Sequence, residues 1–450
     1  MKRKIYNTLK QWKEKRADKE ALLIDGARRV GKSWIAEEFA RNEYRSYIII
    51  NFTRLSKEIK SVFDNYLHDP DEFFIRLQLL SGTKLYEKES LIIFDEVQRY
   101  PKAREAVKWL VADGRYHFLE TGSLVSIRKN TKDITIPSEE THVDMWPMDF
   151  EEFLWALDER ILMDFIKDSF ANRHPLGQAI HRKAMDLLRL YIIVGGMPQA
   201  VLEYVDSKDF EEVDHVKRNI LQLYRNDIYQ YAGEQASKVI QIWDSVPSQL
   251  HRSAKRFRIG ALEKGARKRE YSEAFFWLDE ARVVNTCYAA TQPSIGLKLN
   301  RDDARYKLYL GDTGLLLSHT FDQNAIRNDE LYRKLMLGKL EINKGMFIEN
   351  LTAQQLRSAG HPLYYYAKTD RENAENNMEI DFLVRKPVTT SRHNINAIEV
   401  KSTQRYTTSS LNKFEKRFKN YINEAIILHS GDLRIEEGRL YLPLYMGGLI

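Results

Sequence analysis

Residues 1–155 alternate short apolar runs with patterns of helical period. The apolar runs are bounded by polar or turn residues and cover positions 21–25, 46–52, 90–96 and 116–122. Helical patterns fill most of the intervals between them. Strands that are apolar on both faces and alternate with helices are typical of a parallel sheet covered on both sides. We therefore expect an α/β domain built on a parallel sheet.

The pattern changes twice after this region. From 149 to about 290 the period is mostly helical, and "ARYKLYLGDTGLLLS" then predicts a strand followed by a turn. From 345 onward a helix, three strands, a helix and a further strand follow, at 345–360, 362–368, 379–386, 396–402, 409–418 and 424–430. No proline- or glycine-rich linker marks a boundary. The predicted division is 1–155, a helical middle at 156–335, and a second α/β unit at 336–450.

Composition narrows the class of protein. The chain has 450 residues, of which 43% are hydrophobic and 30% charged, as in ordinary multidomain globular proteins. Cys287 is the only cysteine, which excludes an internal disulfide or a cysteine-based zinc site and suits the reducing cytoplasm. The basic N-terminus lacks the apolar core of a signal peptide. No run of 18 apolar residues occurs, so no membrane span is expected.

The stretch "GARRVGKS" fits the phosphate-binding pattern G-x-x-x-x-G-K-S/T. It lies between a buried strand and a helix, where backbone N–H groups and the helix dipole point at one place. Lys32 is expected to reach the β- and γ-phosphates of ATP, and Ser33 to hold Mg²⁺. The expected nucleotide-binding residues are Gly26, Ala27, Arg28, Arg29, Val30, Gly31, Lys32, Ser33 and Trp34. The two arginines suit either the phosphates or acids of a neighbouring domain.

A loop of this kind requires an acidic partner on a neighbouring strand. "LIIFDEVQ" supplies Asp95, expected to support Mg²⁺, and Glu96, expected to polarise the attacking water. The next strand ends in Thr121 and Ser123, which suit either a sensor of the γ-phosphate or a plain turn. These residues would meet at the carboxyl edge of the sheet.

Together these motifs resemble the prokaryotic AAA+-related ATPases that carry a C-terminal restriction-endonuclease-like domain. The resemblance runs from residue 20 to 430 through "GARRVGKS", "IIFDEVQ", "ETGS", "MWPMDFEEFL", "VGGMPQAV", "LYRNDI", "YLGDTGLLLS", "FIENLTAQQL" and "EIDFLVRK…NAIEVKST". It implies a nucleotide contact at Gly196 and Pro198, although Gly-Gly and Pro also make an ordinary helix-ending turn. Relatives often have Gly-Arg where this chain has Glu139 and Glu140. That departure leaves the arginine finger unassigned, with Arg225 as a substitute.

The segment "HRSAKRFRIGALEKGARKRE" is strongly basic. Its cations are Arg252, Lys255, Arg256, Arg258, Lys264, Arg267, Lys268 and Arg269, against two acids. Helices followed by an apolar β-like run resemble a winged helix, which would place this cluster on nucleic-acid phosphates. A solvated basic face, or one that packs on an acidic partner, is the alternative.

The C-terminal strands carry an acid-and-lysine set. Asp381 lies on one strand, and Glu399 and Lys401 are two apart on the next, with Glu349 on the preceding helix. If the strands are neighbours, the carboxylates would share Mg²⁺ or Mn²⁺ and Lys401 would stabilise developing charge. This resembles the D…E-x-K site of restriction-type nucleases. A catalytically inactive fold that only binds is the alternative.

These motifs predict an ATPase that uses ATP and Mg²⁺ and is coupled to a nucleic-acid-associated, nuclease-like module. The alternative is a nucleotide-controlled signalling or assembly switch with an inactive binding platform. A metabolic kinase is disfavoured by the length of chain beyond the P-loop domain. The expected partners are nucleic acid, with DNA favoured, and further copies of the chain. No membrane partner is expected.

Overall fold

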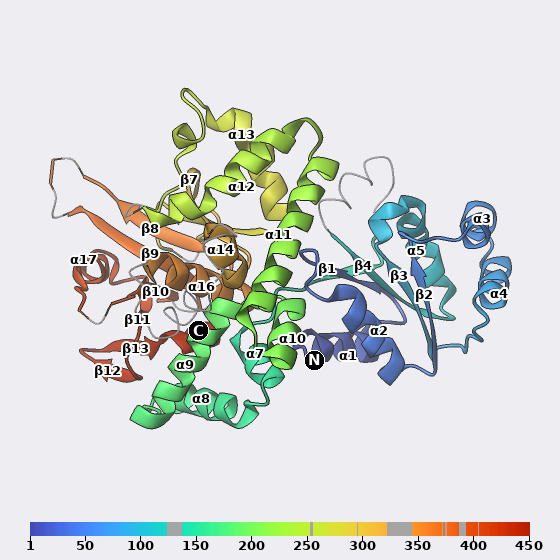
Figure 1. The fold of residues 1–450 in the computed structure, drawn as a ribbon, viewed down its shortest axis with the longest axis horizontal. Coiled ribbons are helices and arrows are strands. Elements are labelled where there is room, and N and C mark those ends of the chain that lie inside the picture. The colour runs from blue at the N-terminus through green and yellow to red at the C-terminus, as the bar shows by residue number, and fades with distance from the viewer. Residues whose placement is uncertain are drawn as a thin grey trace. The chain divides into compact units, whose positions relative to one another are not determined.

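The computed structural model describes residues 1–123, 137–252, 255–294, 296–321, 344–370, 372–373, 376–386, 393–403 and 405–450. These residues form two compact units, Met1–Trp146 and Pro147–Ile450 (Figure 1). The predicted boundary at 335/336 lies outside the described residues. Among the described helices, no single one is long and apolar enough to cross a membrane. Helices α9 (Gln178–Val194) and α10 (Pro198–Ser207) have the length and composition of a membrane span only when taken together, and they are bent by 118°.

The first unit is built on a five-stranded sheet in the order β2-β3-β4-β1-β5, in which every pair is parallel. Its strands are β1 (Ala21–Asp25), β2 (Ser46–Asn51), β3 (Ser90–Asp95), β4 (His117–Gly122) and β5 (Glu140–Asp144). Its helices are α1 (Ile5–Lys15), α2 (Lys32–Glu43), α3 (Lys57–Tyr66), α4 (Pro70–Ser81) and α5 (Pro101–Asp113). The predicted parallel α/β sheet is therefore confirmed.

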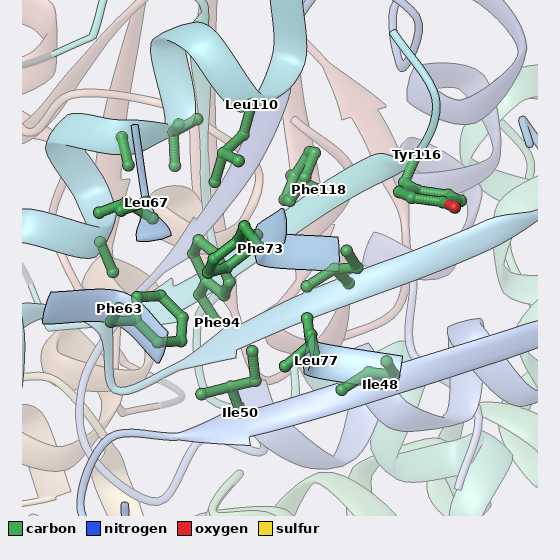
Figure 2. Close-up of a cluster of buried hydrophobic side chains, with 14 of the residues drawn as sticks. Ile48, Ile50, Phe63, Leu67, Phe73, Leu77, Phe94, Leu110, Tyr116 and Phe118 are labelled. Carbon is green, nitrogen blue, oxygen red and sulfur yellow. The ribbon is translucent and has the colours of Figure 1, made fainter. Parts of the chain in front are cut away.

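The hydrophobic core of the first unit explains why its strands are apolar on both faces. On one face, side chains of β2, β3 and β4 pack against α3, α4 and α5, and Figure 2 shows Phe63, Phe73, Phe94 and Phe118 within this cluster. The other face is covered by α2, whose Phe39 and Ala40 are fully buried. Strands covered on both sides lose the polar alternation of exposed strands.

The second unit begins with helices and ends with a mixed sheet. The helices are α7 (Phe150–Ala156), α8 (Arg160–Asn172), α9, α10, α11 (Phe210–Tyr231), α12 (Ala236–His251), α13 (Lys268–Glu280), α14 (Thr313–Thr320), α16 (Lys344–Ser358) and α17 (Ser409–Phe418). The strands are β6 (Val284–Ala290), β7 (Arg301–Leu310), β8 (Tyr364–Lys368), β9 (Met378–Arg385), β10 (Ile395–Val400), β11 (Ile422–His429), β12 (Arg434–Glu436) and β13 (Arg439–Pro443). They form one eight-stranded sheet, β12-β13-β11-β10-β9-β8-β6-β7.

This sheet links the predicted middle and C-terminal parts. β6 pairs with β7 antiparallel and with β8 parallel, so the β6–β7 hairpin is one end of the larger sheet. The hairpin follows α12 and α13, as a winged helix would require, but it is not free-standing, and the winged helix is not confirmed. On one face of the sheet, Leu411 and Phe414 of α17 pack with Ala397 and Ile427. A restriction-endonuclease-like fold stays a prediction.

Candidate functional site

The loop between β1 and α2 needs both of its glycines. Gly31 has φ 99°, a left-handed conformation that glycine adopts without a Cβ penalty. At Gly26 a Cβ would lie 2.2 Å from the carbonyl oxygen of Met145, so any other residue would force the backbone apart. The loop can therefore turn tightly at the end of β1 and begin α2 at Lys32.

Lys32 folds back over this loop. Its ammonium donates hydrogen bonds to the carbonyl oxygens of Gly26 and Ala27, both at 2.9 Å. Burial lowers the pKa of Lys32, while the nearby charges of Glu96, Asp25 and Asp95 oppose that shift. Charged acceptors form roughly twice as strong a hydrogen bond as neutral ones, so an anionic phosphate would be a better partner than these two carbonyls.

Asp95, at the end of β3, is the centre of the site. Its Oδ1 accepts hydrogen bonds from Ser33 Oγ at 2.6 Å and Thr121 Oγ1 at 2.5 Å, and its Oδ2 accepts from Asn51 Nδ2 at 2.6 Å. The donors come from α2, β4 and β2, which meet where the parallel strands end. The structure thus brings together three of the predicted residues and adds Asn51, which sequence reasoning missed although it ends an apolar strand.

Glu96 follows Asp95 in a left-handed conformation, with φ 58° and ψ 45°. Its N–H donates to Thr121 Oγ1 at 3.3 Å, and its carboxylate accepts from Gln98 Nε2 at 2.5 Å. A non-glycine residue in this region costs about 1–2 kcal/mol. Strained backbone of this kind clusters at functional sites because the surrounding contacts impose it.

Two further residues brace the loop without any signal in the sequence. Arg3, which is 7% exposed, donates to the carbonyl oxygens of Val30 at 2.7 Å and Trp146 at 2.6 Å. Asp25 accepts from the N–H of Gly26 at 2.8 Å through its side chain. The basic N-terminal stretch therefore contains a residue that supports the phosphate loop.

The remaining predicted residues of this unit lie at the same edge of the sheet. Arg28 and Arg29 are exposed on the loop, and Trp34, in the first turn of α2, is 46% exposed. Ser123 follows β4. Whether the arginines contact phosphate or a neighbouring acid stays open.

Glu140, one of the two acids that replace Gly-Arg, has a structural role. Its carboxylate and the guanidinium of Arg104 on α5 form a two-point ion pair at 2.6 and 2.9 Å, with both side chains at most 1% exposed. Burial alone would raise the pKa of Glu140, but Arg104 and His142 lower it to about 2. Beside it, burial and the charge of Glu140 raise the pKa of Glu120 well above its ordinary value.

The predicted nucleotide contact at Gly196 and Pro198 lies in the second unit. The N–H of Gly196 donates to Asp312 Oδ2 at 2.6 Å, and its carbonyl oxygen accepts from the N–H of Met148 at 2.6 Å. Pro198 is the first residue of α10. Arg225 on α11 pairs with Asp244 on α12 at 2.5 Å. The nucleotide contact and the arginine finger stay predictions.

Each carboxylate of the predicted C-terminal set lies beside a lysine. Lys307 of β7 lies 2.7 Å from Glu379, 3.7 Å from Asp381 and 4.0 Å from Glu349, and Lys255 pairs with Glu349. Lysine ammonium groups thus neutralise the carboxylates that were expected to hold a metal ion.

Glu399 belongs to a different cluster. It shares the β10 alternation of Ile395 and Ala397, which pack with α17, and it pairs only with Lys401 at 2.6 Å among the ion pairs of the described residues. Asp381 instead faces Lys307 and the α16 side. Asp381 Oδ2 also accepts a hydrogen bond from the N–H of Val400, the residue after Glu399, at 2.9 Å. A metal site shared by Asp381, Glu399 and Lys401 stays a prediction. Within the described ranges, no three His, Cys, Asp or Glu side chains are placed to hold a metal ion.

The cations of the basic segment fall into an inward-facing one and an accessible group. Lys255 turns inward to Glu349 and is only 12% exposed, so it leaves the predicted nucleic-acid surface. Arg256, Arg258, Lys264, Arg267 and Arg269 are exposed, and Arg252 and Lys268 are half-buried. Seven of the eight predicted cations thus remain accessible.

The sequence of the first unit is similar to that of a known protein family. Residues 18–154 match the family model described as an AAA domain. Residues 185–325 and 344–446 match two models described as domains of unknown function, DUF8612 and DUF4143. None of the curated proteins matches the chain.

Solved structures resemble the chain only loosely. The Walker-type ATPase PabY2304 of Pyrococcus abyssi is 15% identical, with 70% of this chain and 94% of that one covered and a TM-score of 0.40. The Orc1 protein of Aeropyrum pernix, solved with DNA, is 14% identical over 73% and 94%, with a TM-score of 0.28.

These TM-scores are too low to support an assignment, which rests on the AAA domain match and on the loop geometry. The first unit resembles an AAA-type P-loop ATPase domain over residues 18–154.

Proposed function

We propose that the chain binds ATP with Mg²⁺ and hydrolyses it at the edge of the first sheet. The observation that supports this most is the convergence of Ser33, Thr121 and Asn51 on Asp95, beside Lys32 and Glu96. In this proposal Lys32 and the loop N–H groups hold the phosphates, Ser33 and Asp95 hold Mg²⁺, and Glu96 orients the water. Thr121 and Ser123 sense the γ-phosphate.

The second unit is proposed to bind nucleic acid, DNA in the first place, and to respond to the state of the nucleotide. Support comes from the accessible cations of the basic segment, because clustered unpaired cations attract a phosphate backbone. A chain with one buried free thiol, Cys287, suits a reducing cytoplasm. Contacts of Gly196 and Pro198 with the nucleotide, and of Arg225 with a neighbouring copy's nucleotide, are part of this proposal.

One observation favours the second candidate, a nucleotide-controlled switch whose C-terminal part only binds. Glu349 pairs with Lys255, Asp381 lies beside Lys307, and Glu399 pairs with Lys401. A nuclease would need these carboxylates together and open to a metal ion. We therefore propose a binding platform at this end of the chain rather than a nuclease.

The test is the rate of ATP hydrolysis with and without single-stranded DNA, double-stranded DNA and RNA. A rate that rises with nucleic acid supports the coupled ATPase. ATP-dependent change in oligomer mass, with a rate indifferent to all three, supports the switch. No Mg²⁺-dependent hydrolysis under any of these conditions contradicts the proposal.

A further inference from the structure

A pocket of about 430 Å³ opens beside the basic segment in the second unit. It is lined by Arg256, Phe257, Arg258, Ile259, Lys268, Ala304 and Tyr306. Its volume lies within the roughly 300–1,000 Å³ of small-ligand sites. The lining residues come from the turn after α12, the start of α13 and the strand β7.

The floor of the pocket is rigid and aromatic. The rings of Phe257 and Tyr306 stack with centroids 6.0 Å apart, and Phe275 contacts both edge-on at 5.1 and 5.0 Å. The N–H of Phe257 donates to the carbonyl oxygen of Tyr306 at 2.9 Å. The walls that carry the charged side chains are therefore held in place by packing and by a backbone hydrogen bond.

Tyr306 presents a polar group that the protein does not satisfy. Its side chain is 5% exposed, and within the described part of the chain its hydroxyl has no hydrogen-bond partner. A buried hydroxyl without a partner is costly, and native proteins rarely leave one.

Three cations surround the same space. Among the described residues, no acid forms an ion pair with Arg256, Arg258 or Lys268, and the Lys268 ammonium lies 5.3 Å from the centre of the Tyr306 ring. The nearest acids, Asp302 and Asp303, are engaged by Arg305 and Arg301, each at 2.6 Å. Arg256, Arg258 and Lys268 therefore concentrate positive charge at the pocket.

We propose that this pocket binds a phosphate group of a nucleic-acid strand. Two guanidinium groups and an ammonium are donors that suit phosphate oxygens. Naming nucleic acid as the source of the phosphate rests on the proposed function. It is favoured over a free nucleotide because Lys264, Arg267 and Arg269, exposed in the same segment, would serve only a ligand that extends beyond the pocket.

The experiment measures binding of a labelled single-stranded DNA oligonucleotide to the full chain by fluorescence anisotropy over a range of salt concentrations. Arg256→Ala with Arg258→Ala should weaken binding at least tenfold and flatten its salt dependence, because about 0.7 counterion fewer is released per lost phosphate contact. Lys268→Ala should also weaken binding and flatten the salt dependence, by less than the double arginine variant, because it removes one cation. Lys416→Ala with Lys419→Ala, two exposed lysines at the C-terminal end of α17, is the matched control for charge.

Weaker binding by both pocket variants, each with its expected salt dependence, supports the proposal. Affinity losses no larger than that of the control pair would overturn it. Inorganic phosphate or AMP that binds the pocket while the oligonucleotide is unaffected by the variants would overturn the nucleic-acid source. ATP binding and hydrolysis by the unaltered chain are measured separately, so their absence would contradict the proposed ATPase without bearing on the pocket.

Discussion

The hydroxyl of Ser33 donates a hydrogen bond to Asp95 Oδ1 at 2.6 Å, although the two residues lie 62 positions apart in the chain. One follows the phosphate loop on α2 and the other ends β3. A hydroxyl and a carboxylate are both hard oxygen ligands of the kind that Mg²⁺ takes. This contact joins the loop and the acidic strand end into one site.

Ser33→Ala should raise the Mg²⁺ concentration needed for half-maximal ATP hydrolysis at least several-fold. The substitution removes one oxygen ligand and leaves the fold of the loop intact, because Ser33 is not one of the positions that need glycine. Hydrolysis is measured against Mg²⁺ at fixed ATP. Ser61→Ala, exposed on α3, should behave like the unaltered chain. An unchanged Mg²⁺ requirement in Ser33→Ala would remove this residue from the proposed metal site.

Lys32→Ala should abolish ATP binding. The Lys32 ammonium is buried at the loop and donates to the backbone carbonyl oxygens of Gly26 and Ala27. Its loss removes the charge that would meet the β- and γ-phosphates. Binding is measured by calorimetric titration of the full chain with ATP and Mg²⁺. Lys102→Ala, exposed on α5, is the control. If Lys32→Ala binds ATP as tightly as the control, the phosphate loop is misassigned.

Replacement by glutamine should lower the free energy of unfolding at Glu140 but not at Glu120. Glu140→Gln leaves the buried Arg104 guanidinium unpaired, which should cost about 3–5 kcal/mol of unfolding free energy. Glu120→Gln should not, because the raised pKa of Glu120 favours its neutral form, and a glutamine amide is also neutral and can donate to Glu140.

The pH dependence follows from the sign of the Glu120 shift. An acid whose pKa is raised by folding binds its proton more tightly in the folded state, so stability falls as pH rises above the ordinary pKa of 4.5. Glu120→Gln should therefore gain stability over the unaltered chain by up to about 1.4 kcal/mol per pH unit above that value. Unfolding midpoints are compared from pH 4.5 to 8. A constant difference across this range would contradict the assignment of a raised pKa.

Lys307→Met should destabilise the second unit by about 3–5 kcal/mol, because Glu379 and Asp381 lose the buried ammonium that neutralises them. Burial and the charge of Glu349 raise the pKa of Asp381 to about 7, so the loss should shrink as pH falls through 7 toward 4. Chemical unfolding midpoints are measured beside those of Lys419→Met, an exposed lysine directly after α17. Equal midpoints for both variants at pH 8 would show that Lys307 does not neutralise this cluster.

Local patterns predicted the first unit well. Strand–loop–helix order and apolar runs on both faces predicted the parallel sheet, and the parallel order then placed Lys32, Ser33, Asp95 and Thr121 at one edge. Arg3 could not be predicted, because it reaches Val30 only after α1 has packed on the domain. Asn51 is similar: its role depends on β2 lying beside β3.

The second unit was harder for a physical reason. Spacing along β10 correctly put Glu399 and Lys401 on one side, and they pair at 2.6 Å. It could not reveal which face of the sheet Asp381 occupies, nor that Lys307 arrives from β7, a strand of the predicted middle domain. Partners supplied by distant strands are set by tertiary packing, which local periodicity does not record.

The most direct test of the central claim is the Mg²⁺-dependent ATP hydrolysis of the unaltered chain beside Glu96→Gln. We expect measurable hydrolysis by the unaltered chain. We also expect that Glu96→Gln binds ATP with similar affinity and loses turnover by at least about a hundredfold, because it removes the group that polarises water and no phosphate contact. Normal hydrolysis by Glu96→Gln, or no hydrolysis by the unaltered chain, would contradict the central claim.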